Sequence, residues 1–252
     1  MAKLKKQHMT IHWKAIVQDD SSIPATEATL KEKATLVGRI GLMMLSVGTG
    51  AWRVRNSMNK VSRCLGITCT ADIGLLAISY TCIEGTDTYT QSISNPTTGV
   101  NTHKLMQLEL FMKEFPDKVS TYSVKHIHEV LDEIQKLPAN YKAWNLGLAS
   151  ALACGAFTFL LGGGPVEMCC AFLGAGVGNF VRKKMLGHSI SLLANVAVSV
   201  AASCLVYVLT ILLAQSLLSV SAVHQAGYIC AMLFVIPGFP LITGGIDLAK
   251  LD

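Results

Sequence analysis

The chain has 252 residues, of which 51% are hydrophobic, and a net charge of +5 at pH 7. This length fits one or two domains. The positive charge does not indicate a nucleic-acid partner, because Lys3, Lys5 and Lys6 form a short tail and the other basic residues are mixed with acidic ones. A solvated surface, or a tail that touches anionic lipid, explains it better.

The charged residues are unevenly distributed along the chain. Residues 1–142 hold nearly all of them, whereas residues 143–252 hold only four cations and three anions. This asymmetry predicts a polar domain followed by a membrane domain. The seven charged residues of the second part are Arg182, Lys183, Lys184, Lys250, Glu167, Asp247 and Asp252.

The eight cysteines indicate neither a metal site nor a disulfide framework. None forms a paired CxxC arrangement, and the last five lie in apolar runs, where Cys behaves as a small hydrophobic residue. We therefore expect no metal and no cofactor. The first residues are basic but no apolar core follows them, so they do not resemble a signal peptide, and we expect the first domain to be cytoplasmic.

The first predicted elements are two helices. Residues 1–25 are expected to form a flexible tail. Residues 26–47 then carry the apolar spacing of a helix, with Ser22 or Thr26 as the candidate N-cap. Residues 50–65 predict a second helix, closed by a glycine.

A β-hairpin and two further helices follow. Residues 72–83 are rich in β-forming residue types and residues 86–93 alternate, with a two-residue turn between them. Residues 103–115 and 123–137 return to helical spacing. Residues 26–140 are therefore expected to form an α+β domain.

Candidate catalytic residues are few in this first domain. Cys82 and His103 would form a nucleophile and its base only if the fold brought them together. His126 and His128 lie two apart, on different sides of a helix, so they cannot share a metal ion as an i, i+4 pair would. Lone Cys and His residues are usually packing or surface residues.

Four apolar runs make up the second domain, residues 141–252, at residues 144–161, 166–181, 188–218 and about 228–246. The third run has 31 residues and no charge. A bilayer core of about 30 Å needs roughly 20 apolar residues, so this run can cross it. A buried helix of a soluble protein is the alternative. We expect a membrane bundle with four transmembrane helices after a cytoplasmic α+β domain.

Small polar residues recur at every fourth position of the third run. Residues four apart share one side of a helix, so they form one slanting stripe that must face other helices or a wet cavity. For the serines we expect contacts between helices, whereas Asn195 is either such a contact or part of a substrate path. The stripe consists of Ser191, Asn195, Ser199, Ser203 and Tyr207.

The positions of the few cations predict the orientation. Lys142 precedes the first run, residues 182–184 lie between the second and third, and Lys250 follows the fourth, while the other two loops have no cation. By the positive-inside rule, the charged ends and both termini face the cytoplasm.

Glycines and one carboxylate mark the second run. Gly174 and Gly178 form a GxxxG pair that lets another helix approach closely. Glu167 lies near the outer end of this run, where it either reaches water or serves as a proton or cation site.

The fourth run is interrupted near its middle. Pro237, Gly238 and Pro240 remove backbone donors, and such breaks recur at transporter binding sites. Asp247 follows at the cytoplasmic end, where a solvated helix end competes with an ion-binding role.

With these residues in view, the chain resembles the threonine/serine exporter (ThrE) family, and within it the N-terminal component of the split form. The most specific match is the sequence VIPGFPLITGGIDL at residues 235–248. Arg182 followed thirteen residues later by Asn195, and the GVN sequence that ends at Asn101, also resemble the family pattern.

The resemblance implies an exporter in the inner (plasma) membrane for small polar metabolites, either threonine and serine or dicarboxylates such as succinate. It further implies coupling to the proton gradient, oligomerisation, and work with a second membrane subunit or downstream domain. Family members continue past the signature Asp into another helix, so we expect a further helix after residue 252.

Three hypotheses remain at this stage: a transporter that is no enzyme, a membrane-anchored hydrolase that uses Cys82, and an assembly module that only docks a partner. For the transporter, the candidates for proton coupling are Glu167 and Asp247. The substrate-path candidates are Asn195, Ser199, Pro237, Gly238, Pro240, Arg182 and Asn101.

Overall fold

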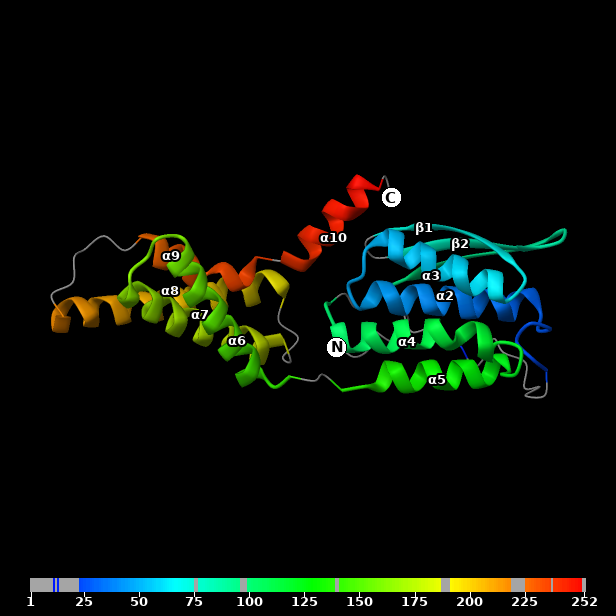
Figure 1. The fold of residues 1–252 in the computed structure, drawn as a ribbon, viewed down its shortest axis with the longest axis horizontal. Coiled ribbons are helices and arrows are strands. Elements are labelled where there is room, and N and C mark those ends of the chain that lie inside the picture. The colour runs from blue at the N-terminus through cyan, green and yellow to red at the C-terminus, as the bar shows by residue number, and fades with distance from the viewer. Residues whose placement is uncertain are drawn as a thin grey trace. The chain divides into compact units, whose positions relative to one another are not determined.

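The computed structural model describes residues 11, 13, 23–74, 77–95, 99–138, 141–186, 191–218, 225–236 and 238–250. It is rich in helix and contains one small sheet (Figure 1). The chain divides into two compact units. Unit 1 comprises Met1–Pro138 and Phe239–Asp252, and unit 2 comprises Ala139–Gly238. The predicted flexible tail lies largely outside the described residues, and the predicted domain division stays a prediction.

The described residues of unit 1 form two helices, three strands and two more helices in chain order, and nearly all of α10 (Gly238–Ala249) also belongs to this unit. The sheet, the first helix pair and the second helix pair lie one above the other (Figure 1). The elements are α2 (Leu30–Ser46), α3 (Ala51–Cys64), β1 (Thr68–Ile73), β2 (Ala77–Glu84), β3 (Asp87–Ser94), α4 (Thr102–Lys118) and α5 (Val124–Lys136).

The sheet is antiparallel, with the order β1-β2-β3. Its inner face packs on α2 and α3 through alternate residues such as Ile78, Tyr80 and Cys82. The outer face is polar, and Thr81 and Thr90 join there across the strands at 2.9 Å. The predicted hairpin is present as β2 and β3, but its first strand starts at residue 77, and β1 was not predicted.

Helix α2 is the centre of unit 1. It contacts β2 and β3 on one side and α5 on another, so every residue from Glu32 to Gly41 is buried. Its N-cap is Thr29, which forms a capping box with Glu32. The predicted caps Ser22 and Thr26 are therefore wrong: Thr26 lies in a turn before the helix, and Ser22 is outside the described residues.

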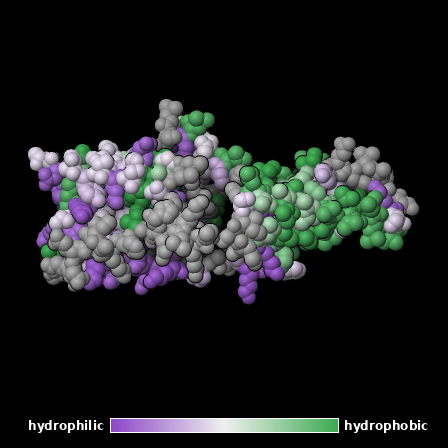
Figure 2. All heavy atoms as spheres, turned by 180° about the vertical axis from the view of Figure 1, so that it is seen from behind, coloured by the Kyte–Doolittle hydropathy of each residue, from purple (hydrophilic) through white to green (hydrophobic). Residues whose placement is uncertain are grey.

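Unit 2 is helical and largely apolar at its surface (Figure 2). Exposed Leu148, Phe159, Leu193, Leu209 and Leu213 show that its helices present hydrophobic side chains outwards. Its elements are α6 (Ala143–Leu160), α7 (Pro165–Met185), α8 (Leu192–Leu218), α9 (Gln225–Ala231) and the 3-10 helix η3 (Leu233–Val235).

Within the part of the chain that the structure describes, two helices, α6 and α8, are long and apolar enough to cross a membrane, and a third candidate arises if residues 226–235 and 240–249 form one broken span. The four predicted spans are therefore not confirmed. Helix α7 occupies the predicted second span, but its glycines, Glu167 and the terminal cluster at residues 182–184 lower its apolar character. Residues 188–190 of the predicted third span lie outside the described residues.

Candidate functional site

Four helical segments of unit 2 are joined in pairs by two polar contacts, which we call the polar seam. The Ser203 hydroxyl of α8 donates to the carbonyl oxygen of Ala231 in α9 at 2.7 Å. The Arg182 guanidinium of α7 donates through Nη1 to the carbonyl oxygen of Phe234 in η3 at 2.9 Å. Both acceptors are backbone groups at the end of a short helix, where carbonyls lack intrahelical partners.

The GxxxG pair of α7 makes this close packing sterically possible. A Cβ atom on Gly174 would lie 2.9 Å from the Ser203 carbonyl oxygen, and one on Gly178 would lie 2.7 Å from the Phe234 ring. Side chains at these positions would separate the helices. The two glycines therefore serve packing here, as small residues do in membrane bundles.

Asn195 and Ser199 lie on the buried side of α8 but differ in their hydrogen bonds. The Ser199 hydroxyl donates to the Val196 carbonyl oxygen of its own helix at 2.9 Å. Asn195 is 1% exposed, and its Oδ1 atom has no hydrogen-bond partner among the described residues. A buried acceptor without a partner costs about 1–3 kcal/mol. Asn195 therefore retains a polar atom that another molecule or segment can satisfy.

Glu167 caps the start of α7. It is 8% exposed, and its Oε2 atom accepts from the Gly164 N–H at 2.6 Å. A Cβ on Gly227 of α9 would lie 2.5 Å from the Tyr207 hydroxyl and 3.0 Å from Glu167 Cβ. The glycine thus brings α9 against a carboxylate of α7 and a phenol of α8.

Asp247 of α10 caps a helix within unit 1. Its carboxylate oxygens accept from the N–H groups of Ala51 at 2.9 Å and Trp52 at 3.4 Å, at the start of α3. Lys250 lies over the Trp52 ring at 3.5 Å. Negative charge is favourable at a helix N-terminus, so this contact holds α10 in place. No local sequence signal pairs residues almost 200 positions apart.

The remaining substrate-path candidates are divided between the units. Gly238 and Pro240 are exposed in α10, and Pro237 lies outside the described residues. Asn101 belongs to unit 1, where its side chain accepts from the Lys104 N–H at 3.1 Å and so caps α4. Asn195, Ser199, Arg182 and Glu167 belong to unit 2.

Asn101 also lines a cavity of about 450 Å³ in unit 1, which the sequence analysis did not predict. Residues from α2, α4 and α5, from the segment after β3 and from the N-terminal region meet there. The lining residues are Trp13, Arg39, Leu42, Met43, Ser46, Val47, Asn95, Gly99, Val100, Asn101, Lys104, Leu108, Ile134 and Gln135.

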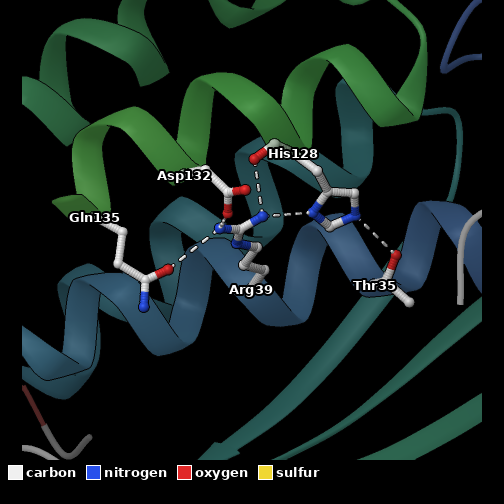
Figure 3. A network of polar contacts seen from close by, with 5 residues as sticks. All are labelled: Thr35, Arg39, His128, Asp132 and Gln135. Carbon is white, nitrogen blue, oxygen red and sulfur yellow. Dashed lines mark hydrogen bonds and ion pairs between the residues drawn. The ribbon is translucent and has the colours of Figure 1, made fainter. Parts of the chain in front are cut away.

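One wall of this cavity contains a buried arginine held by α5 (Figure 3). Arg39 is 1% exposed, pairs through Nη2 with Asp132, and donates to the Gln135 side-chain oxygen at 3.2 Å. Its Nη1 donates to His128 Nδ1 at 3.0 Å and to the His128 carbonyl oxygen at 2.9 Å. Each of these partners of the buried guanidinium belongs to α5.

These contacts fix the protonation of His128. Arginine has only donors, so Nδ1 of His128 must accept, and the ring proton lies on Nε2, 3.4 Å from the Thr35 hydroxyl. Burial, reinforced by the charge of Arg39, lowers the pKa of His128 to about 3. The imidazole is therefore neutral at physiological pH.

The contacts of Cys82 do not favour nucleophilic chemistry. It is buried in β2 opposite Cys69, and its hydrogen bond with the Cys69 thiol, together with burial, raises the pKa of Cys82. A thiol of raised pKa is a poor nucleophile. His103 lies at the start of α4 and no hydrogen bond joins it to Cys82. The described residues contain no cluster of three or more potential metal ligands.

Comparison with known proteins identifies relatives of this chain. Residues 35–252 match the model of a family described as "Putative threonine/serine exporter". The chain is 24% identical over 212 residues to "Probable succinate transporter subunit YjjP" of Klebsiella aerogenes, an alignment that covers 83% of this chain and 78% of that protein. No solved structure matches the chain.

Proposed function

The chain belongs to the threonine/serine exporter family, and we propose that it is one subunit of an exporter for small polar metabolites, threonine and serine or dicarboxylates such as succinate. The family identifies a membrane transporter rather than an enzyme. The apolar helices α6 and α8 agree with a membrane protein.

The buried Oδ1 of Asn195, which has no hydrogen-bond partner in the described part of the chain, is the observation that best supports a substrate path along α8. A polar atom inside an apolar bundle is costly, and residues retained in such positions commonly mark a pathway. Oδ1 is an acceptor, so it would accept a hydrogen bond from a hydroxyl or ammonium group of the substrate. Ser199 lies one helical turn further along the same buried side.

The break around residues 237–240 is proposed as the second part of the path. An interrupted helix leaves backbone groups for water or substrate, as in other transporters. Arg182 supports this role because it holds the carbonyl of Phe234, just before the break. Pro237, Gly238 and Pro240 would then expose backbone at the binding site. Asn101, which caps α4 in unit 1, stays a separate candidate for a substrate contact.

Glu167 is the stronger of the two candidates for proton coupling. It is a nearly buried carboxylate at the start of α7, and Gly227 of α9 lies close to both Glu167 and Tyr207. A change in its protonation would alter its hold on the Gly164 N–H and hence the start of α7. Asp247 would act in a similar way on the start of α3, which its ionised carboxylate caps.

A second membrane subunit or downstream domain would complete the transporter. The relative is itself named a subunit, which supports a partner of this kind. We propose a multi-pass protein of the plasma membrane with unit 1 in the cytoplasm. Lys142 and the cations at residues 182–184 flank the apolar helices of unit 2, and cations beside membrane helices favour the cytoplasmic side. The apolar outer surface of unit 2 would then meet lipid, the partner or further copies of the chain.

A substrate-resolved efflux assay tests this function. Cells that express the chain with its partner subunit are loaded with labelled threonine, serine or succinate, and release is compared with cells that lack both subunits. We expect faster release of at least one substrate, and a rate that rises with the proton gradient. Equal release of all three substrates in both strains would refute the proposal.

A further inference from the structure

The cavity of unit 1 has the size and chemistry of a ligand site that is separate from the proposed membrane path. Its volume of about 450 Å³ lies within the range of small-molecule pockets, roughly 300–1,000 Å³. Among the described residues, its lining includes two cations and no acidic side chain. The cavity therefore favours an anion.

Lys104 supplies the charge that is available to this anion. Arg39 is already balanced by Asp132, whereas Lys104 forms no ion pair with any described residue. Its ammonium group donates to the Gln135 carbonyl oxygen at 2.6 Å, which leaves two further donors. A carboxylate that binds here loses its hydration, and a charge-assisted hydrogen bond from Lys104 compensates for that cost.

The start of α4 adds to the positive potential around Lys104. Asn101 is the N-cap of this 17-residue helix and lines the cavity together with Lys104. The positive end of the helix dipole therefore lies at the cavity. Asn95, which is nearly buried, adds a carboxamide to the same lining.

Most of the other lining residues are apolar. Ser46 and Gln135 are polar, but the Ser46 hydroxyl donates to the Met43 carbonyl oxygen at 2.7 Å and the Gln135 side-chain oxygen accepts from Arg39 at 3.2 Å. Leu42 and Met43 come from α2, Leu108 from α4 and Ile134 from α5. A ligand with two charged ends would leave one of them against these side chains without a partner, which is unfavourable. The lining suits a ligand with one anionic group and a hydrocarbon body.

We infer that this cavity binds a small organic monocarboxylate, with its carboxylate at Lys104 and the start of α4 and its apolar body against Leu42, Met43, Leu108 and Ile134. The site belongs to unit 1 and does not require transport. It gives the cytoplasmic unit a ligand that is chemically distinct from the polar metabolites proposed for the membrane path.

Calorimetric titration of the purified full-length chain in detergent tests this site. The probes are 4-methylpentanoate, its neutral amide and succinate. We expect saturable binding of 4-methylpentanoate, and binding of the amide and of succinate at least about tenfold weaker, because the first lacks the charge and the second places a charge on the apolar wall. No saturable binding of 4-methylpentanoate, or equal binding of all three probes, would overturn the inference.

Matched variants locate the binding. Lys104→Gln should weaken 4-methylpentanoate binding at least about tenfold, whereas Lys113→Gln, an exposed lysine of the same helix outside the cavity, should leave it unchanged. Ser46→Met should weaken it by filling the cavity, and thermal unfolding confirms that each variant is folded. Undiminished binding by both folded cavity variants would place the ligand elsewhere. Because the assay measures binding alone, its result is independent of efflux.

Discussion

Arg39 shows how a single residue depends on distant partners. Its guanidinium is buried in unit 1, and Asp132 supplies the compensating negative charge (Figure 3). We expect Asp132→Asn to lower the free energy of unfolding by about 2–3 kcal/mol, because a buried charge then loses its counter-ion. Denaturant titration of the purified chain, followed by tryptophan fluorescence, measures this loss.

An exposed ion pair provides the control for Asp132→Asn. Arg53 and Glu109 lie 3.0 Å apart on the surface of unit 1, and both side chains are about half exposed. Solvent screens such pairs, so Glu109→Gln should cost less than about 1 kcal/mol. Equal losses in the two variants would mean that Asp132 contributes no more than a surface carboxylate.

His128 makes the stability of unit 1 depend on pH. Its pKa is lowered to about 3 in the folded protein, whereas an unfolded histidine has a pKa near 6.5. Below pH 6.5 the unfolded state binds a proton that the folded state does not bind, so stability falls as the pH falls towards 3. Through His128, the free energy of unfolding is expected to be lower at pH 5 than at pH 7 by about 2 kcal/mol.

Unfolding at pH 7 and pH 5 measures this effect. His128→Gln should reduce the difference between the two pH values, since glutamine does not titrate. His126→Gln should leave the difference as it is, because His126 is exposed. A pH dependence that survives intact in His128→Gln would contradict the assignment of a neutral buried imidazole.

At the scale of elements, α7 depends on glycines for its contact with α8. A side chain on Gly174 would collide with the Ser203 backbone, whereas Val177 is 41% exposed on another side of α7. We expect Gly174→Ile to destabilise the chain by about 1–3 kcal/mol and Val177→Ile to have little effect. Thermal unfolding in detergent compares them, and equal melting temperatures would show that the α7–α8 contact is not tight.

Elements with strong local signals could be predicted from the sequence. The helix predicted at residues 50–65 and the turn predicted between the two hairpin strands are confirmed. Gly66, just after the helix, and Gly85, in the turn, both have positive φ, a conformation that glycine adopts readily. Strand β1 has only six residues, of which Cys69, Ala71 and Ile73 alternate with polar ones. The predicted hairpin begins at residue 72 and therefore does not include this strand.

The candidate site was harder to predict because its contacts join distant segments. Periodicity indicated that Asn195 would face away from lipid, and the structure shows it buried. The partners of Arg39 lie 89 to 96 residues further along the chain, and no local pattern signals that this arginine is buried. The cavity beside it arises from the packing of five segments and has no sequence motif of its own.

At the scale of the whole molecule, the uneven distribution of charge distinguishes a charged unit 1 from a largely apolar unit 2. Unit 1 pairs its buried charges, as Lys33 does with Glu84 at 2.5 Å. Unit 2 contains few charges and exposes leucine and phenylalanine side chains instead. The number of spans could not be predicted from apolar runs alone, because α7 combines a helix of sufficient length with glycines and charged ends.

The most direct measurement of the central claim is efflux from proteoliposomes that contain the chain and its partner, loaded with labelled threonine or succinate. We predict that the wild-type protein releases substrate faster than empty liposomes and that Asn195→Ala lowers the rate at least about tenfold. Ser216→Ala, which removes an exposed hydroxyl that is hydrogen-bonded within α8, should keep the wild-type efflux rate. Release no faster than from empty liposomes, or an unchanged rate in Asn195→Ala, would contradict this account.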